Sequence, residues 1–378
     1  MSKLSNNKLL GAISILALGL SVSANADMID SPINTANVQA LISAGNGDNS
    51  QTPGDAIDGR IDANNSGSRF TGVVSLNPII DDVGYICTGT VISKRHILTA
   101  AHCVDSDGLG NVIDLNDPSN DMTVVFNASS TYSDIHFGVE DILIHEDYDG
   151  FNICSDGSGG CLNDDIAIIT LDHDVPDDVE IYGFYDQQVW DTANLGSDGD
   201  TFTMVGYGTR GDGHNGYTEG PNFAEKLVGG NIVDFIGFDD DGIKGPEVWY
   251  ADFDGNYTDV DGLFGDVGVV YPIDFLCANY GVCSSWLGED VETNIGGGDS
   301  GGPSFVYDAI NDRYLIAGIN TFGADTSPLG IAGAFGSYFG GILVNPYQAW
   351  INAEIPAPAT LALFMLALAG LASSRRKV

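Results

Sequence analysis

The most informative segment of this chain reads Gly298-Asp299-Ser300-Gly301-Gly302-Pro303. A serine hydroxyl is a weak nucleophile at neutral pH, so it needs a base within hydrogen-bond reach. Glycines on both sides of Ser300 free the backbone for a sharp turn, which allows the N–H groups of Gly298 and Ser300 to converge on a developing oxyanion. Taken alone, such a run could also be an ordinary glycine-rich loop. The residues upstream decide between these two interpretations.

Two upstream segments supply the other groups that a catalytic serine needs. Residues 99–103 (Thr-Ala-Ala-His-Cys) contain His102, and residues 163–169 (Asn-Asp-Asp-Ile-Ala-Ile-Ile) contain Asp165. We expect His102 to take the serine proton and return it to the leaving amine, and Asp165 to hold the imidazole tautomer and stabilise the imidazolium. Each of the two alone could be structural, the histidine in a core and the aspartate at a strand edge. The chain order His, Asp, Ser favours the catalytic interpretation.

These residues and their order resemble the trypsin-like, or chymotrypsin-fold, serine proteases, and they differ from the orders found in subtilisins and α/β-hydrolases. The resemblance implies an all-β fold of two six-stranded antiparallel β-barrels with a short C-terminal helix. It implies a secreted or surface-delivered endopeptidase that hydrolyses the peptide bonds of proteins and peptides through an acyl-enzyme, with no cofactor required and no catalytic metal. The alternative is a non-catalytic surface or matrix protein that uses the same fold for binding.

The spacing of short β-rich runs predicts the same architecture. These runs occupy residues 72–76, 83–92, 96–99, 122–126, 166–171 and 202–207. Turn residues separate them, as in antiparallel barrels. We expect a protease domain at residues 61–355, with a first barrel at about 61–180 that carries the histidine and aspartate and a second at about 181–355 that carries the serine. The active site would lie between the barrels, and residues 346–355 would form the closing helix.

The N-terminal part of the chain reads as a targeting segment followed by a pro-segment. Residues 1–26 have a polar start with Lys3 and Lys8, then an apolar run, then Ala-Asn-Ala ending at Ala26. This is the pattern of a secretory signal peptide that is cleaved after Ala26. Residues 27–60 are polar and poor in apolar side chains. We therefore expect a flexible pro-segment there.

Residues 356–378 resemble a bacterial PEP-CTERM sorting signal. They contain Pro-Ala-Pro at 356–358, an apolar stretch, and three basic residues at 375–377. The family has Glu where this chain has Ala357. The resemblance implies an exosortase-like processing enzyme as partner, transient membrane association through the tail, and export to the surface or exterior of a Gram-negative bacterium. The stretch is short for a membrane span, which usually takes about 20 apolar residues. The alternative is a plain C-terminal anchor helix.

The charge of the chain excludes one class of partner. Between the two targeting segments, residues 27–356 carry 8 Lys and Arg residues against 53 Asp and Glu residues, a net charge of −45. Such a surface repels nucleic acid and anionic lipid. We expect a soluble exported domain with no nucleic-acid partner.

The six cysteines form three local pairs: Cys87 with Cys103, Cys154 with Cys161, and Cys277 with Cys283. The first pair matches the family's disulfide beside the catalytic histidine, and the third lies where the family often has another. An even count in an exported chain indicates disulfides, and zinc is a poor alternative without paired Cys-x-x-Cys units. One family bridge is missing, because Gly296 stands four residues before Ser300, where a cysteine is usual.

An acidic stretch at residues 239–261 is a candidate calcium site. Residues 239–241 are three aspartates, and Asp252, Asp254 and Asn256 place oxygen ligands at alternating positions, which hard cations such as Ca²⁺ favour. No glutamate stands at the twelfth position from Asp252, so an EF-hand loop is not supported. The alternative is a set of acidic surface turns.

Activation by proteolysis is a further expectation from the resemblance. Family members are typically switched on when cleavage frees an apolar N-terminus whose ammonium pairs with the aspartate beside the nucleophile. The candidate bond is Arg60–Ile61, which lies 15 residues before Leu76, and the acceptor would be Asp299. Residues 62–64 (Asp-Ala-Asn) depart from the family's Val-Gly-Gly.

Three residues carry the prediction of substrate preference. Asn294 stands six residues before the serine, at the expected base of the specificity pocket. Gly323 and Gly341 would leave the mouth of the pocket open. This set favours a neutral side chain before the cleaved bond, the P1 residue. If the local alignment slips, Glu292 or Asp290 could supply a negative base instead.

Overall fold

The computed structural model describes residues 43–44, 60–62, 67–126, 135–154, 157, 159–238, 245–259, 262–288 and 291–355. The predicted signal peptide, most of the predicted pro-segment and the C-terminal tail lie outside these residues. Within them the chain is mostly β-structure with a few short helices. None of the described helices combines the length and the apolar character needed to cross a membrane.

The first predicted barrel is confirmed as a closed barrel of six strands. Its strands are, in order of pairing, β3 (Val73–Ile80), β5 (Cys87–Val91), β6 (His96–Thr99), β9 (Ala167–Leu171), β8 (Ile135–Ile144) and β7 (Asp121–Phe126). All neighbours are antiparallel, and pairing of β7 with β3 closes the barrel. The short strand β4 (Val83–Gly84) extends it beside β3.

The core of this barrel follows from the β-branched and leucine side chains of its strands. Leu76, Ile97, Val124 and Ile169 are fully buried in one hydrophobic cluster. Such side chains fit a pleated surface that is covered on one face. A Cβ atom at Gly89 would lie 2.5 Å from Ile97 Cγ2, so glycine is required where these strands pack most closely.

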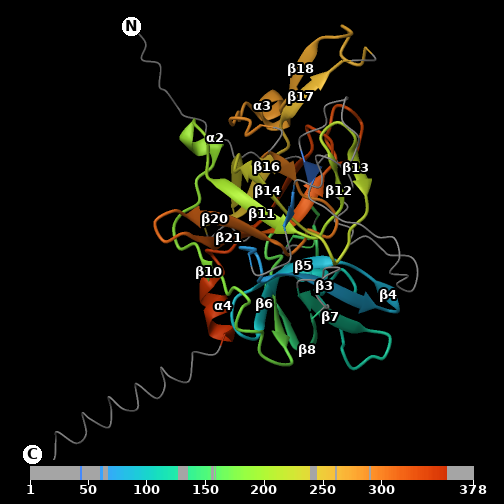
Figure 1. Cartoon of the computed structure of the whole chain (residues 1–378), viewed down its shortest axis with the longest axis vertical. Helices are drawn as coiled ribbons and strands as arrows, with labels where there is room; N and C mark the ends of the chain where they lie inside the picture. Colours follow the sequence, from blue (N-terminus) through green and yellow to red (C-terminus); the bar gives the residue numbers. More distant parts are fainter. Residues whose placement is uncertain are drawn as a thin grey trace, which may run out of the picture.

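The second half of the chain forms a larger antiparallel sheet, which lies above the barrel in Figure 1. Its strand order is β15 (Phe235–Phe238), β16 (Pro246–Asp252), β22 (Tyr338–Leu343), β21 (Arg313–Ala324), β20 (Pro303–Asp308), β11 (Thr201–Gly206), β14 (Lys226–Ile232) and β2 (Ile61–Asp62). The strand β10 (Gly183–Phe184) adds to β21 in parallel.

The second closed barrel that we predicted is not confirmed. No strand pairing among the described residues closes the larger sheet between β14 and β16. A side chain bridges the two strands instead: the amide of Asn231 donates to the carbonyl oxygens of Asp252, at 2.7 Å, and Thr293, at 3.0 Å. The sheet therefore curves toward closure without a continuous ladder.

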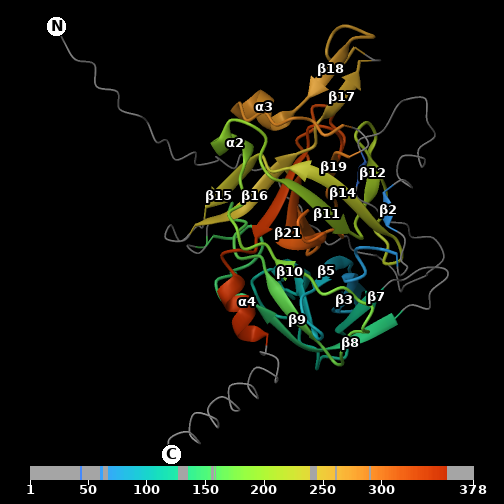
Figure 2. The same ribbon diagram turned by 60° about the vertical axis from the view of Figure 1, so that its left-hand side comes forward.

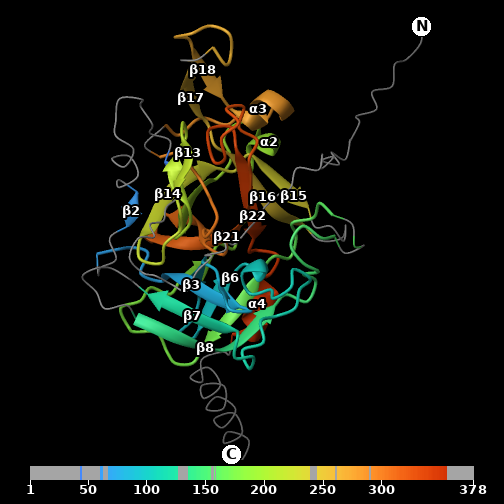
Figure 3. The same cartoon turned by 90° about the vertical axis from the view of Figure 1, so that its right-hand side faces the viewer.

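Two smaller sheets flank this half. One contains β13 (Gly216–Glu219), β12 (Arg210–Asp212), β1 (Ser43–Ala44) and β19 (Thr293–Asn294). The other pairs β17 (Gly255–Thr258) with β18 (Val270–Ile273), and Figure 3 shows this hairpin projecting from the body beside helix α3 (Phe275–Tyr280). Strand β1 comes from the predicted pro-segment, so part of that segment is paired rather than flexible.

The remaining helices are short. They are the 3₁₀ helix η1 (Ala101–Cys103), α2 (Thr192–Leu195) and α4 (Gln348–Glu354). Helix α4 confirms the predicted closing helix, and it lies against the side of the first barrel in Figures 1 and 2. There the rings of Tyr347 and Trp350 pack edge-on against His145, with centroids 4.9 and 5.0 Å away. The last residues of the chain's described part are thus fastened to its first barrel.

Candidate active site

His102 and Asp165 form a pair with two hydrogen bonds. Helix η1, which follows β6, presents His102, and Asp165 lies just before β9. His102 Nδ1 is 2.7 Å from Asp165 Oδ2, and the His102 backbone N–H donates to Asp165 Oδ1 at 2.8 Å. The carboxylate is 1% exposed. A proton on Nδ1 leaves Nε2 as the acceptor on the opposite side of the ring.

The residue before Asp165 is anchored independently. Asp164 has a left-handed backbone, with φ 58°, which is strained for a residue other than glycine. Its N–H donates to Glu247 Oε1 and to the Tyr347 hydroxyl, both at 3.1 Å, and its Oδ1 accepts from that hydroxyl at 3.1 Å. His145 Nδ1 lies 3.3 Å from the same Oδ1. These contacts orient Asp165 toward His102, and sequence patterns gave no signal for Glu247 or Tyr347.

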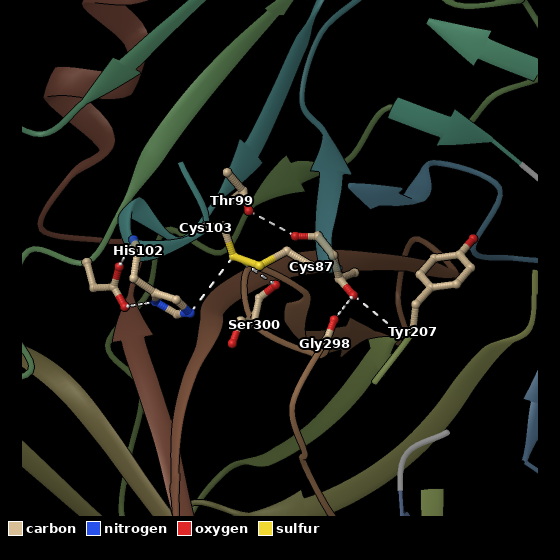
Figure 4. The surroundings of a disulfide bond; sticks show 9 residues. Cys87, Thr99, His102, Cys103, Tyr207, Gly298 and Ser300 are labelled. Carbon is tan, nitrogen blue, oxygen red and sulfur yellow. Dashed lines mark hydrogen bonds and ion pairs between the residues drawn. A yellow bond between two sulfur atoms is a disulfide. The ribbon is translucent and has the colours of Figure 1, made fainter. Parts of the chain in front are cut away.

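The Cys87–Cys103 disulfide lies next to both the histidine and the serine loop. Cys103 Sγ is 3.9 Å from His102 Nε2 and 3.6 Å from the carbonyl oxygen of Ser300. Figure 4 shows the imidazole and the Ser300 side chain on the same side of this disulfide. None of the hydrogen bonds formed by the described residues joins Ser300 Oγ to Nε2. Catalytic hydrogen bonds of this kind are often long before substrate binds.

Thr88 of the first barrel fixes the loop that carries Ser300. The Thr88 N–H donates to the Ser300 carbonyl at 2.8 Å, and its hydroxyl donates to the Gly298 carbonyl at 2.8 Å. The same hydroxyl accepts from the N–H of Tyr207 at 3.1 Å. In Figure 4, dashed lines run from the labelled Gly298 and Tyr207 to this hydroxyl. The loop of the second sheet is therefore held by a strand of the first barrel.

Gly298, which we predict to be an oxyanion donor, lies in the left-handed region of backbone conformation. Gly298 has φ 99°, and a Cβ atom there would lie 2.9 Å from Gly208 Cα, so only glycine fits without strain. Its carbonyl points to Thr88. Within the part of the chain that the structure describes, neither the N–H of Gly298 nor that of Ser300 donates a hydrogen bond.

Asp299 is fully buried beneath this loop. Its Oδ1 accepts from the Gly208 N–H at 2.8 Å and its Oδ2 from the Gly296 N–H at 2.9 Å. Burial raises the pKa of the Asp299 carboxyl to about 7, and the hydrogen bonds from Gly296 and Gly208 offset part of that rise. A buried carboxyl of this kind is stabilised by a cationic partner.

The predicted activation bond lies within a sheet. Ile61 pairs with Leu227 in the β2–β14 ladder, and the Val228 N–H donates to the Arg60 carbonyl at 3.0 Å. In this arrangement Ile61 is part of a continuous strand, and the described contacts of the Asp299 carboxylate are the two backbone donors given above. The activation assignment stays a prediction.

The predicted specificity residues are placed as follows. Asn294 is buried in β19, where its Nδ2 donates to the Tyr217 hydroxyl at 3.3 Å and its Oδ1 has no hydrogen-bond partner among the described residues. Gly323 lies opposite Phe339 on β22, whereas Gly341 lies opposite Asn320. A bulge after Asn320 shifts the register of the two strands here, and the expectation that both glycines leave the pocket mouth open stays a prediction.

The two alternative bases for the pocket have different outcomes. Glu292 is buried away from the Ser300 loop, and its Oε2 accepts from the Leu287 N–H at 3.0 Å. Asp290 lies outside the described residues. All three predicted disulfides are confirmed, and no described cysteine is free.

Comparison with known proteins agrees with this geometry. Residues 57–226 match the trypsin family model, and residues 354–377 match the PEP-CTERM protein-sorting motif. The chain is similar to the trypsin Tyr p 3.0101 of Tyrophagus putrescentiae, at 36% identity over 77 residues, which are 20% of this chain and 24% of the relative. It is also similar to the venom serine protease Bi-VSP of Bombus ignitus, at 31% identity over 106 residues, which are 28% of this chain and 25% of the relative.

The matched segments thus span about a quarter of each curated relative. The trypsin match begins at residue 57, three residues before Arg60. These matches assign residues 57–226 to the trypsin family model and residues 354–377 to the PEP-CTERM protein-sorting motif.

Proposed function

We propose that this protein is an exported serine endopeptidase that cleaves peptide bonds with Ser300, His102 and Asp165. The observation that carries the proposal is the His102–Asp165 pair, which is joined by two hydrogen bonds. The Cys103 sulfur atom lies near both His102 Nε2 and the Ser300 carbonyl oxygen, so the histidine and the serine loop are neighbours. The family membership of residues 57–226 supports the same activity.

The proposed reaction has two halves, acylation and then deacylation of Ser300, and the same catalytic groups act in each. Ser300 Oγ attacks the peptide carbonyl carbon while His102 Nε2 takes its proton, and the N–H groups of Gly298 and Ser300 bind the oxyanion that forms. The C–N bond then breaks as His102 returns the proton to the leaving amine, which leaves an ester on Ser300. Water then attacks the ester carbonyl carbon while His102 takes its proton. The ester bond breaks as His102 returns the proton to Ser300 Oγ, and the carboxylic acid product is released. Asp165 stabilises the imidazolium in both halves.

The activation step is a separate part of the proposal. Cleavage at Arg60–Ile61 would free an ammonium that could pair with the buried Asp299 carboxylate. Two observations bear on it: the new N-terminus would have to leave the β2–β14 ladder, and the trypsin match already begins at residue 57. The N-terminal sequence of the active species decides whether the cut lies at residue 60 or upstream of it.

The proposed substrate preference is for neutral P1 residues. Asn294 brings no charge to the expected pocket base. The proposed partners are protein or peptide substrates and an exosortase-like processing enzyme that recognises residues 354–377. The matched sorting motif also supports export by a Gram-negative bacterium.

One observation favours a second candidate, a non-catalytic binding protein on the same fold. Among the described residues, Ser300 Oγ makes no hydrogen bond to His102 Nε2. A binding protein has no need for that contact, whereas a protease must form it when substrate arrives.

A fluorophosphonate probe separates the two candidates. The full chain, purified after export, is treated with the probe before and after limited trypsin digestion, and the adduct and the N-terminus are located by mass spectrometry. The protease predicts an adduct on Ser300 that is absent from Ser300→Ala and His102→Ala. No adduct under either condition, in protein whose folding is verified by circular dichroism, would reject the protease and favour the binding protein.

A further inference from the structure

Five carboxylates gather where the second sheet meets the β17–β18 hairpin. They are Asp234 after β14, Asp252 at the end of β16, Asp254 before β17, Asp274 before α3, and Glu292 before β19. Four of them are buried, with Asp254 the most exposed of those at 4%, and Asp274 is half-buried. Buried carboxylates are costly unless they are paired, hydrogen-bonded or bound to a metal ion. The cluster therefore needs a compensating partner.

Three of these side chains converge on one point. One carboxylate oxygen from each of Asp252, Asp254 and Asp274 lies within 4.8 Å of the others. Backbone donors orient two of the three: Asp252 Oδ2 accepts from the Leu276 N–H at 2.8 Å, and Asp274 Oδ1 accepts from the Cys277 N–H at 2.7 Å. The second oxygen of each of these carboxylates receives no backbone donor from the described residues.

Two carboxylate oxygens of the cluster have no hydrogen-bond donor among the described residues. Asp254 Oδ1 and Asp234 Oδ1 are both inaccessible to solvent and have no hydrogen-bond partner in the described part of the chain. No described lysine, arginine or histidine forms an ion pair with any of the five carboxylates. Native proteins rarely leave such groups without a partner, and a bound ion is one of the standard reasons for an acceptor that lacks a protein donor.

The acidities of these groups agree with a site of uncompensated negative charge. Burial raises the pKa of the Asp254 carboxyl to about 11, and the charges of Asp252, Asp274, Glu292 and Asp234 add to the rise. Burial likewise raises the pKa of the Glu292 carboxyl to about 8. Without a cation, part of this cluster must therefore be protonated near neutral pH, and a bound cation would remove that need.

We propose that Asp252, Asp254 and Asp274 bind one Ca²⁺ ion, with Asp234 and Glu292 adding negative charge around it. Ca²⁺ takes oxygen ligands at about 2.3–2.6 Å, so ligand oxygens on opposite sides of the ion stand about 4.6–5.2 Å apart. Three oxygens within 4.8 Å of one another can share one such ion, and Ca²⁺ accepts irregular coordination, whereas Mg²⁺ demands near-ideal octahedral geometry. Water would complete the coordination. This proposal does not depend on protease activity.

The ion would join elements that are otherwise weakly connected. Asp252 belongs to the large sheet, Asp254 precedes the projecting hairpin, and Asp274 caps helix α3. Figure 3 shows that the hairpin and α3 stand out from the body at this place. Glu292 leads directly into Thr293–Asn294, the expected pocket base. Occupancy would therefore brace both the hairpin and the segment that enters the Ser300 loop.

The test compares the full exported chain with Asp254→Asn, which keeps the shape of the side chain and removes its charge. Two control variants change acidic residues elsewhere: Asp117→Asn in an exposed turn, and Asp147→Asn in the His145–Asp147–Asp164 group. Calcium binding is measured by isothermal titration calorimetry with CaCl₂ after EDTA treatment. Thermal unfolding is followed in EDTA and in CaCl₂.

We expect one Ca²⁺ per chain with a Kd at or below about 10⁻³ M, and a rise of several degrees in the unfolding midpoint when Ca²⁺ is added. Asp254→Asn should weaken binding at least about tenfold, and the two controls should bind as the wild type does. In EDTA, Asp254→Asn should unfold at a higher temperature than the wild type, because an amide costs less to bury than a carboxyl group that lacks its cation; in CaCl₂ that order should reverse. The absence of saturable binding, or wild-type affinity in Asp254→Asn, would overturn the proposal.

Discussion

Several structural constraints act on Gly298. Its φ of 99° and its approach to Gly208 leave no room for a side chain, and its carbonyl is fixed by Thr88. The peptide must turn in this way to direct its N–H, with that of Ser300, toward the same point. In the proposed protease this glycine therefore acts through geometry and through its backbone donor.

Gly298→Ala should consequently impair catalysis more than folding. We expect kcat/KM for peptide substrates to fall by about 10²–10³, the loss typical of one missing oxyanion donor. The measurement is steady-state kinetics beside urea unfolding. As a control, Gly220→Ala changes a glycine whose added Cβ has nothing within 4 Å, and it should keep wild-type turnover. Equal turnover in Gly298→Ala would remove this glycine from the mechanism.

Lys226 introduces a pH dependence of stability. Its side chain is fully buried, donates to the Phe70 carbonyl at 2.5 Å and lies 3.3 Å from Asp62 Oδ2. Burial lowers the pKa of Lys226 from 10.5 to about 8, although the Asp62 carboxylate opposes that shift. The unfolded chain therefore binds more protons than the folded chain between about pH 8 and pH 10.5, so this residue makes stability rise with pH across that window.

Lys226→Met should flatten that rise. Other groups titrate alike in both proteins, so the difference between them reports Lys226. We expect the wild-type free energy of unfolding to gain on the order of 3 kcal/mol relative to the variant between pH 8 and pH 10.5. Urea unfolding at several pH values measures it. Parallel pH profiles in the two proteins would show that the Lys226 ammonium keeps its ordinary pKa.

At the scale of elements, helix α4 and the loop before β9 support each other. Tyr347 stands at the start of α4 and bonds to both the N–H and the carboxylate of Asp164, and its ring packs against His145. This contact lets the end of the described chain position the residue beside Asp165. The link was invisible in the sequence, because 183 residues separate Tyr347 from Asp164.

Removal of the Tyr347 hydroxyl should therefore affect both stability and activity. Tyr347→Phe removes one partner each from the buried N–H and Oδ1 of Asp164, which keep Glu247 and His145 as neighbours. The loss should cost about 0.5–1.5 kcal/mol of unfolding free energy. We expect kcat to fall while KM changes little, since the loss acts on the orientation of Asp165. Tyr307→Phe, which removes an exposed hydroxyl bonded to Asp312, is the matched control and should leave kcat unchanged. Urea unfolding and steady-state kinetics are measured on the same preparations. A wild-type kcat in Tyr347→Phe would show that the hydroxyl has a purely structural role.

At the scale of the whole molecule, sequence reasoning succeeded where the determinants are local. The spacing of short β-rich runs predicted the first barrel, and the local pairs of cysteines predicted all three disulfides. The segments around His102, Asp165 and Ser300 predicted the family. Each of these signals is contained in a few neighbouring residues, so it can be read without knowing the fold.

It failed where long-range pairing decides. The second sheet stays open, and the Asn231 side chain, rather than a ladder, links β14 to β16. Asp274 joins Asp252 and Asp254 only through the path of the β17–β18 hairpin. None of these outcomes has a local pattern, since each depends on the register of distant strands.

The central claim is that the His102–Asp165 pair activates Ser300. Peptide hydrolysis by the full exported chain, measured beside Ser300→Ala after the activating cut has been verified by N-terminal sequencing, tests it most directly. The account predicts turnover in the wild type and a loss of about 10⁴–10⁶ in kcat for Ser300→Ala, with the unfolding midpoint unchanged. Wild-type turnover in Ser300→Ala, or no turnover in the folded and cleaved wild type, would contradict it.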